Sequence, residues 1–220
     1  MLQLLQPCLM LITDSALCPG ASLESAVELA VAGGVNAVQV REKSMPSGEL
    51  LQLAQRLRAI TDGKAMLTIN DRADITVACD ADGVQLPETG ISPKVARLVM
   101  GRDALVGCSV HSLQGALNAE RAGADYVILG TIYPSRSHPE GPVAGVGLLK
   151  EVCQAASIPV LAIGGVTKDN ITEVIESGAA GAAVISAILG ADDPKIATQA
   201  ILGEMTRSWS QRPSIAPRRH

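Results

Sequence analysis

Aromatic residues are nearly absent from this chain of 220 residues, which contains one Trp, two Tyr and no Phe. Proteins that bind single-stranded nucleic acid stack the bases on aromatic side chains. The net charge of −4 also gives no general attraction for a phosphate backbone. We therefore expect no nucleic-acid partner.

Long hydrophobic runs are missing too. Hydrophobic residues make up 47% of the chain, yet no apolar run reaches the roughly 18 residues that suggest a membrane span. The start of the chain lacks the basic segment and small-residue cleavage site of a secretory signal. The five cysteines are odd in number and lack CxxC spacing, which predicts reduced, buried thiols. These absences favour a cytoplasmic protein with no membrane partner.

Short apolar runs rich in Val, Ile and Leu are present, and they alternate with segments of helical spacing. Runs of about four to eight such residues predict strands. The expected strands are 8–14, 37–42, 65–70, 83–86, 105–110, 126–132, 159–164 and 181–186. The expected helices are 22–32, 47–60, 92–100, 112–122, 147–156, 168–177 and 194–209. The first four of these open on a serine, which is typical of helix N-termini.

Strand alternating with helix eight times predicts a single (β/α)₈ TIM barrel of the α/β class over residues 1–207. The polar segment 208–220 is expected to be a disordered tail outside this fold. Turns of small residues and glycine recur before alternate strands, at 33–38, 81–84, 122–127 and 178–183. This regularity favours the barrel, and a doubly wound open sheet remains the alternative.

The C-terminal ends of parallel barrel strands surround one pocket. Each expected strand here ends in a polar or glycine tip, and the second and fourth carry Gln39 and Gln85. Arg41 and Lys43 lie one residue apart at the exit of the second strand, so both cations can face one phosphate or diphosphate. The alternative for these two residues is a surface pair matched to Glu42.

Two further tips carry groups that suit chemistry. Asn70 and Asp71 end the third strand, where the amide can orient a ligand and the carboxylate can hold Mg²⁺ or a hydroxyl; a helix N-cap is the alternative. Ser109 and His111 end the fifth strand on one face. His111 is one of three histidines, and imidazole moves protons near neutral pH. A purely structural histidine is the alternative.

The remaining candidates bind anions. A long irregular segment after the sixth strand contains Ser135 and Ser137, and it can form either a lid over an anion or a mobile connector. Gly164 and Gly165 follow the seventh strand, and Ile185 and Ser186 follow the eighth. Backbone amides of these two loops often bind phosphate in barrels of this kind.

Taken together, these segments resemble the thiamine phosphate synthase and thiazole tautomerase superfamily. The resemblance extends from about residue 11 to residue 194. Its motifs are VQVREK (38–43), IND (69–71), DGVQLP (82–87), VGCSVHS (106–112), GADYVILGTIYPS (123–135), IPVLAIGGV (158–166) and AVISAI (183–188).

For the synthase, the resemblance implies joining of hydroxymethylpyrimidine diphosphate to a thiazole phosphate, with release of diphosphate. Magnesium and cations then neutralise the leaving group. The implied diphosphate site is Arg41, Lys43 and Asn70, with Asp71 as the magnesium ligand. Ser109, Ser135 and Ser137 would contact the diphosphate or the pyrimidine, and Gly165, Ile185 and Ser186 the thiazole phosphate.

Two departures from the synthase pattern favour the tautomerase. Gly90 stands where the synthase has a second magnesium-binding aspartate, and His138 stands where its loop carries a lysine. The tautomerase resembles this chain in its Val-Gln-Leu-Pro and Ser-Val-His-Ser segments. It is an isomerase that needs no metal, and it moves one proton to make a thiazole carboxylate phosphate aromatic. One departure from the tautomerase pattern is Thr131, where that enzyme can carry a histidine.

We therefore expect a thiazole tautomerase first, with His111 as the proton shuttle and Arg41 or Gln85 holding the carboxylate. The alternative is the synthase, a transferase that uses Mg²⁺. A third possibility is a barrel that binds the phosphate ligand without catalysis. The expected partner is a small thiazole phosphate, and the sequence is compatible with a homodimer.

Overall fold

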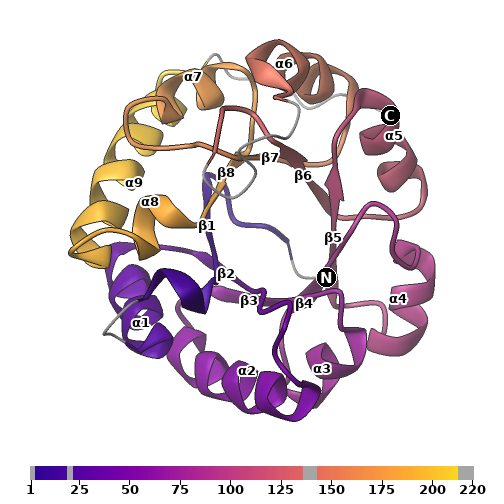
Figure 1. Cartoon of the computed structure of the whole chain (residues 1–220). Coiled ribbons are helices and arrows are strands. Elements are labelled where there is room, and N and C mark those ends of the chain that lie inside the picture. Colours follow the sequence, from indigo (N-terminus) through magenta and orange to yellow (C-terminus); the bar gives the residue numbers. More distant parts are fainter. Residues whose placement is uncertain (1–2, 19–21, 136–142, 213–220) are drawn as a thin grey trace.

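In the computed structural model, eight parallel strands close into a barrel inside a ring of helices (Figure 1). The structure describes residues 3–18, 22–135 and 143–212. Neighbouring strands in the chain pair in order, and β8 closes on β1 with Cys8 opposite Gly181. The predicted TIM barrel is confirmed, and the open sheet is not formed. The strands are β1 (Cys8–Ile12), β2 (Ala37–Val40), β3 (Met66–Asn70), β4 (Gly83–Leu86), β5 (Leu105–Val110), β6 (Tyr126–Gly130), β7 (Val160–Ile163) and β8 (Gly181–Val184).

The helices cover the outside of the barrel and connect consecutive strands (Figure 1). Two short ones, α3 and α8, were not among the expected segments, because six or four residues show little helical periodicity. The helical elements are η1 (Ser15–Leu17), α1 (Leu23–Gly33), α2 (Ser47–Thr61), α3 (Ala73–Ala78), α4 (Pro93–Met100), α5 (Leu113–Arg121), α6 (Gly145–Ala155), α7 (Ile171–Glu176), α8 (Ser186–Leu189) and α9 (Pro194–Ser210).

Serine hydroxyls begin three of the helices as expected. Ser22, Ser92 and Ser112 are the N-caps of α1, α4 and α5, and each accepts a hydrogen bond from the amide three residues later. Ser47 does not cap α2, because it is the first helical residue and its hydroxyl accepts from Arg72 Nη1 at 2.8 Å. Local capping chemistry therefore sets most of these boundaries.

The hydrophobic core has two parts. One lies between the helices and the outer face of the strands, and the other fills the barrel interior with side chains such as Met10, Leu105 and Tyr126. All five cysteines are free thiols, and Cys8, Cys79 and Cys108 are buried. No described helix is long and apolar enough to cross a membrane.

The C-terminal helix α9 extends past the boundary that we expected after residue 207. Ser208 is buried and bonds to Thr172 Oγ1 at 3.1 Å, and Trp209 packs against the outer core. Arg212 donates from Nε to the Ile175 carbonyl at 2.9 Å. Residues 208–212 thus pack on the barrel, contrary to expectation, and the rest of the expected tail lies outside the described residues.

Candidate functional site

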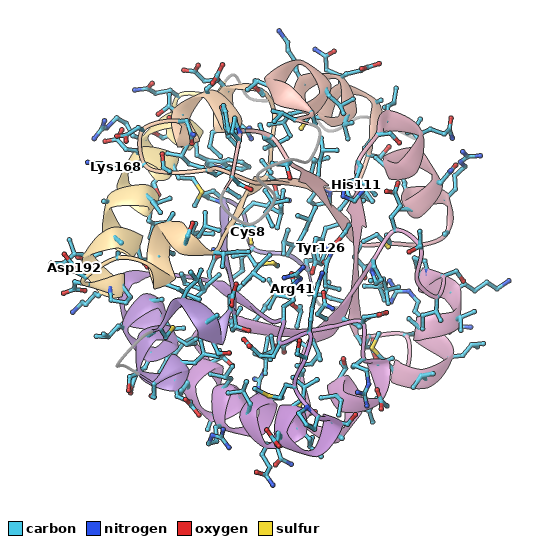
Figure 2. The ribbon with its side chains drawn as sticks, viewed as in Figure 1. Cys8, Arg41, His111, Tyr126, Lys168 and Asp192 are labelled. Carbon is cyan, nitrogen blue, oxygen red and sulfur yellow. The ribbon has the colours of Figure 1, made fainter. Side chains whose placement is uncertain are left out.

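Most of the predicted site residues lie together at the C-terminal ends of the barrel strands. Arg41 follows β2, and its amide donates to the Thr13 hydroxyl after β1 at 2.9 Å. In Figure 2 the half-buried Arg41 lies inside the ring of strands. Glu42 Oε2 accepts from the Ser15 hydroxyl at 2.7 Å and from its amide at 3.2 Å, and Glu42 Oε1 is buried without a partner among the described residues. The guanidinium of Arg41 forms no ion pair with a described carboxylate.

The spacing of Arg41 and Lys43 predicted that both side chains face one anion, and the structure does not show this for Lys43. The strand β2 ends at Val40, two residues earlier than expected, so strand alternation does not direct Arg41 and Lys43 to one side. Lys43 lies exposed in the turn before α2. The geometry therefore supports one cation at the mouth of the barrel and leaves the second as a prediction.

Two buried glutamines hold the tips of the neighbouring strands. Gln39 on β2 donates from Nε2 to Asn70 Oδ1 on β3 at 3.0 Å. Gln85 on β4 donates from Nε2 to Ser109 Oγ on β5 at 3.2 Å. The Oε1 atoms of both glutamines are buried without a partner among the described residues. The site thus contains two fixed amides and two free acceptor oxygens.

Asp71 has the geometry of a functional residue rather than that of a helix cap. Its φ is +56°, in the left-handed region that non-glycine residues rarely adopt. The N-cap of α3 is Arg72, which makes no side-chain cap bond. The Asp71 carboxylate is exposed, and no described residue donates a hydrogen bond to it. Magnesium commonly takes one or two carboxylates together with waters and substrate phosphates, so Asp71 fits one ligand position.

Glu88 and His111 form a pair at the rim. His111 Nδ1 lies 2.6 Å from Glu88 Oε2, and the His111 side chain is 68% exposed. A Cβ on Gly115 would lie 2.2 Å from Glu88 Oε1, so the carboxylate rests against the first turn of α5, where helix-dipole charge favours an anion. In this structure the Glu88 carboxylate thus faces His111 and the first turn of α5.

The structure leaves little room for any side chain at position 90. A Cβ on Gly90 would lie 2.9 Å from both Cδ and Cγ of Pro87. A larger side chain would have to displace the proline ring. Across the described part of the chain, no group of three or more His, Cys, Asp or Glu side chains could hold a metal ion.

Gly164 and Gly165 follow β7 with φ values of +95° and +64°. A Cβ on Gly164 would lie 2.4 Å from Thr131 Cγ2, and one on Gly165 would lie 2.6 Å from the Pro134 carbonyl. Both glycines are therefore required by the close approach of the loop after β6, a reason that the sequence did not reveal. Asn170 Nδ2 fixes this turn by donating to the Gly165 carbonyl at 2.9 Å.

The remaining anion-binding candidates are only partly described. Ser186 begins α8 and follows Ile185, and the first amides of a helix have no acceptor inside the helix. Ser135 is half-buried after β6, whereas Ser137 and His138 lie outside the described residues. Tyr133, which the sequence did not single out, donates to Glu173 Oε2 at 2.7 Å and ties this loop to α7. Desolvation and Glu173 both raise the pKa of Tyr133.

The contact of Gln85 with Gly107 and Tyr126 on the next two strands was not predicted. Gln85, Gly107 and Tyr126 are in register on β4, β5 and β6. A Cβ on Gly107 would lie 2.2 Å from Gln85 Oε1 and 2.3 Å from Tyr126 Cζ. Glycine inside a strand often marks such a close approach. Gly107 therefore makes room for the fully buried Tyr126 beside Gln85.

Comparisons with known proteins agree over nearly the whole chain. A family model described as thiamine monophosphate synthase matches residues 9–188. The thiamine-phosphate synthase of Clostridium tetani is 37% identical over 196 residues, which is 89% of this chain and 94% of the relative. The thiamine-phosphate synthase of Natronomonas pharaonis is 44% identical over 193 residues, 86% of this chain and 90% of the relative.

A solved structure shows the same agreement in three dimensions. The thiamine phosphate pyrophosphorylase of Pyrococcus furiosus superposes with a TM-score of 0.84 at 37% identity. The match covers 91% of this chain and 96% of that protein. The barrel, including the strand ends that carry the site, is therefore shared with a protein of that description.

Proposed function

Because the chain belongs to the thiamine monophosphate synthase family, we propose that it joins hydroxymethylpyrimidine diphosphate to a thiazole phosphate and releases diphosphate. The names of the relatives support this transferase activity over the tautomerase that the sequence motifs favoured. In either case the protein is an enzyme of thiamine biosynthesis.

The observation that carries the proposal is the Arg41 guanidinium. It is half-buried at the mouth of the barrel. The Glu42 carboxylate accepts a hydrogen bond from Ser15 and forms no ion pair with Arg41. A cation without a counter-ion, partly shielded from water, stabilises an anion more strongly than a solvated one. Arg41 is thus suited to the negative charge that develops on the departing diphosphate.

Neighbouring residues would orient this leaving group. Ser109 Oγ accepts from Gln85 Nε2, so its own O–H is available to donate to a diphosphate oxygen. Asn70 Oδ1 is fixed by Gln39, so its amide N–H groups are also available. Asp71 would hold Mg²⁺ together with waters and diphosphate oxygens. Bound magnesium would supply further charge neutralisation.

The thiazole phosphate would bind to the loops after β7 and β8. Gly165 has φ of +64°, and Ser186 begins α8. Backbone amides in such loops bind phosphate in many barrels. The two substrates would then meet across the barrel mouth, with the diphosphate group on the β2 and β3 side.

Replacing Arg41 by Gln tests the proposal directly. We expect synthase turnover to fall about 10- to 100-fold, because hydrogen bonds to charged groups contribute roughly 1.5–3 kcal/mol. Arg56→Gln is the matched control, since Arg56 pairs with Glu24 at 2.8 Å on the outside of the barrel. Turnover of Arg41→Gln equal to that of the control would contradict the assigned role.

The tautomerase remains a second candidate because of the Glu88–His111 pair and Gly90. A carboxylate on Nδ1 fixes the tautomer of the imidazole and leaves Nε2 free to exchange a proton with a ligand. Both reactions should be assayed on one purified sample, with and without Mg²⁺, for the native chain and for His111→Asn.

The outcomes separate the candidates. Magnesium-dependent product formation that survives His111→Asn supports the synthase. Metal-independent isomerisation that His111→Asn abolishes supports the tautomerase. Binding of thiazole phosphate without either reaction would contradict both and would favour a barrel that only binds its ligand.

A further inference from the structure

A side-chain acceptor recurs in the turns before alternate strands, at the N-terminal end of the barrel. Before β4, Asp82 Oδ2 accepts from Arg58 Nη1 of α2 and from the Leu67 amide of β3, both at 2.7 Å. The carboxylate thus closes the start of the β3–β4 pair and neutralises an arginine. This end of the barrel is opposite to the candidate site, which lies at the C-terminal ends of the strands.

The same arrangement is repeated once in full and once without the arginine. Before β6, Asp125 Oδ2 accepts from Arg97 Nη2 of α4 and from the Val106 amide of β5, both at 2.7 Å. Before β2, Asn36 Oδ1 accepts from the Leu9 amide of β1 at 2.9 Å. The barrel can be divided into the strand pairs β1–β2, β3–β4, β5–β6 and β7–β8, each a quarter of it. In the first three quarters, a side-chain oxygen therefore accepts a hydrogen bond from an amide at the start of the odd-numbered strand.

The fourth quarter, β7 and β8, lacks this side-chain oxygen. Ala180 donates its amide to the Val160 carbonyl at 2.7 Å, just as Asp82 donates to Leu67 at 2.8 Å and Asp125 to Val106 at 2.8 Å. Ala180 thus occupies the position of the two aspartates, but its methyl group accepts no hydrogen bond. The helix α6 stands where α2 and α4 supply an arginine, and its Cys153 lines a pocket together with Ala180.

These two small residues leave a cavity of about 540 Å³. Its apolar walls include Ile158, Pro159 and the Trp209 side chain. The complete lining is Gln6, Cys153, Ser157, Ile158, Pro159, Val160, Gly178, Ala180, Trp209 and Arg212. Val160, whose amide corresponds to the amides bonded by Asp82 and Asp125, belongs to this lining.

Arg212, two residues after the end of α9, brings a positive charge to the same cavity. Its Nη2 donates to the carbonyls of Ile175 and Ala179, the latter at 2.6 Å. Its guanidinium lies 4.3 Å from the centre of the Trp209 ring. Burial lowers the pKa of Arg212, and no described carboxylate pairs with it. Arg58 and Arg97 pair with Asp82 and Asp125, whereas Arg212 is a half-buried cation without a carboxylate partner among the described residues.

We propose that this cavity binds a small carboxylate ligand, whose anionic group takes the place of the aspartate missing at Ala180. The carboxylate would accept from Arg212 and from the Val160 amide, as Asp125 accepts from Arg97 and Val106. Arginine pairs strongly with carboxylates, and the apolar walls suit a compact hydrophobic or aromatic body. The site is independent of the proposed function, because it lies at the other end of the barrel.

Trp209 gives a direct readout, because it is the one tryptophan of the chain. Sodium benzoate is the probe, and benzamide at equal ionic strength is the neutral control of the same shape. We expect benzoate, and not benzamide, to change Trp209 fluorescence in a saturable way. Benzoate should also raise the melting temperature of the native protein, since it binds the folded state.

Ala180→Asp is the decisive variant, because it restores the carboxylate of the other quarters. It should weaken benzoate binding at least about tenfold, the effect of losing one charged hydrogen bond. Arg212→Gln should weaken binding to a similar extent. Arg207→Gln is the matched control, since Arg207 of α9 pairs with Glu204 at 2.7 Å on the surface; its affinity should be unchanged.

Three results would overturn the proposal. They are equal responses to benzoate and benzamide, no response to benzoate, and benzoate affinity that is unchanged in Ala180→Asp. Because every readout is binding or melting, the proposal can fail while synthase activity is present, and it can hold while that activity is absent. If Arg212→Gln does not fold, Ala180→Asp alone decides.

Discussion

Adding one methyl group at Gly107 should disturb the site from below. Gly107 lies on β5 between Gln85 of β4 and Tyr126 of β6. A Cβ there would lie 2.2 Å from Gln85 Oε1 and 2.5 Å from the Tyr126 hydroxyl. Both neighbours are fully buried, so neither side chain can move into solvent. We expect Gly107→Ala to push Gln85 away from Ser109.

The expected cost follows from these contacts. Overpacking of a tight core costs roughly 1–3 kcal/mol, and loss of the Gln85–Ser109 hydrogen bond at 3.2 Å adds about 1 kcal/mol. The total of about 2–4 kcal/mol corresponds to a melting temperature about 4–16 °C lower for a chain of this size. The Michaelis constant for the diphosphate substrate should rise as well, because Ser109 loses its fixed position.

Calorimetry and steady-state kinetics on two variants measure both effects. Gly203→Ala is the matched control, because Gly203 lies within α9 and a Cβ there meets nothing within 4 Å. The control should keep or raise the melting temperature, since alanine favours helix over glycine by roughly 0.5–1 kcal/mol. If Gly107→Ala melts with the native protein, the inferred contact between Gln85, Gly107 and Tyr126 is wrong.

Two further predictions concern other parts of the fold. Asp125→Ala removes the acceptor shared by Arg97 and Val106. It should lower the free energy of unfolding by about 2–3 kcal/mol in urea titrations, and a change below 0.5 kcal/mol would contradict this. Burial raises the pKa of Cys8 to about 12 and that of Cys108 to about 11. Both thiols stay protonated at pH 8, so iodoacetamide should label them far more slowly in the folded than in the urea-unfolded protein, by mass spectrometry.

The sequence by itself determined the barrel. Each strand is a short apolar run, each turn carries its own small residues, and serine caps such as Ser22 act within one helical turn. These signals are local, so periodicity and turn chemistry suffice to read them. The same signals placed the strand ends, and with them Arg41, Asn70 and Ser109, around one mouth.

The ends of the secondary-structure elements and the contacts of single side chains were harder to predict from the sequence. The strand β2 ends at Val40 rather than at 42, and residues 208–212 pack on the barrel rather than forming a tail, because side-chain packing decides where an element stops. The missing acid at position 90 was visible in the sequence. The contact between Glu88 and His111 was not visible there.

Only the tertiary structure decided which distant residues meet. Gln85 and Tyr126 are brought together across Gly107, and Arg212 is brought to the quarter of the barrel that lacks an aspartate. These pairings join residues from separate strands and helices, and no local pattern encodes them. Closure of the barrel determines these contacts instead, because it places the separate strands next to one another around one axis.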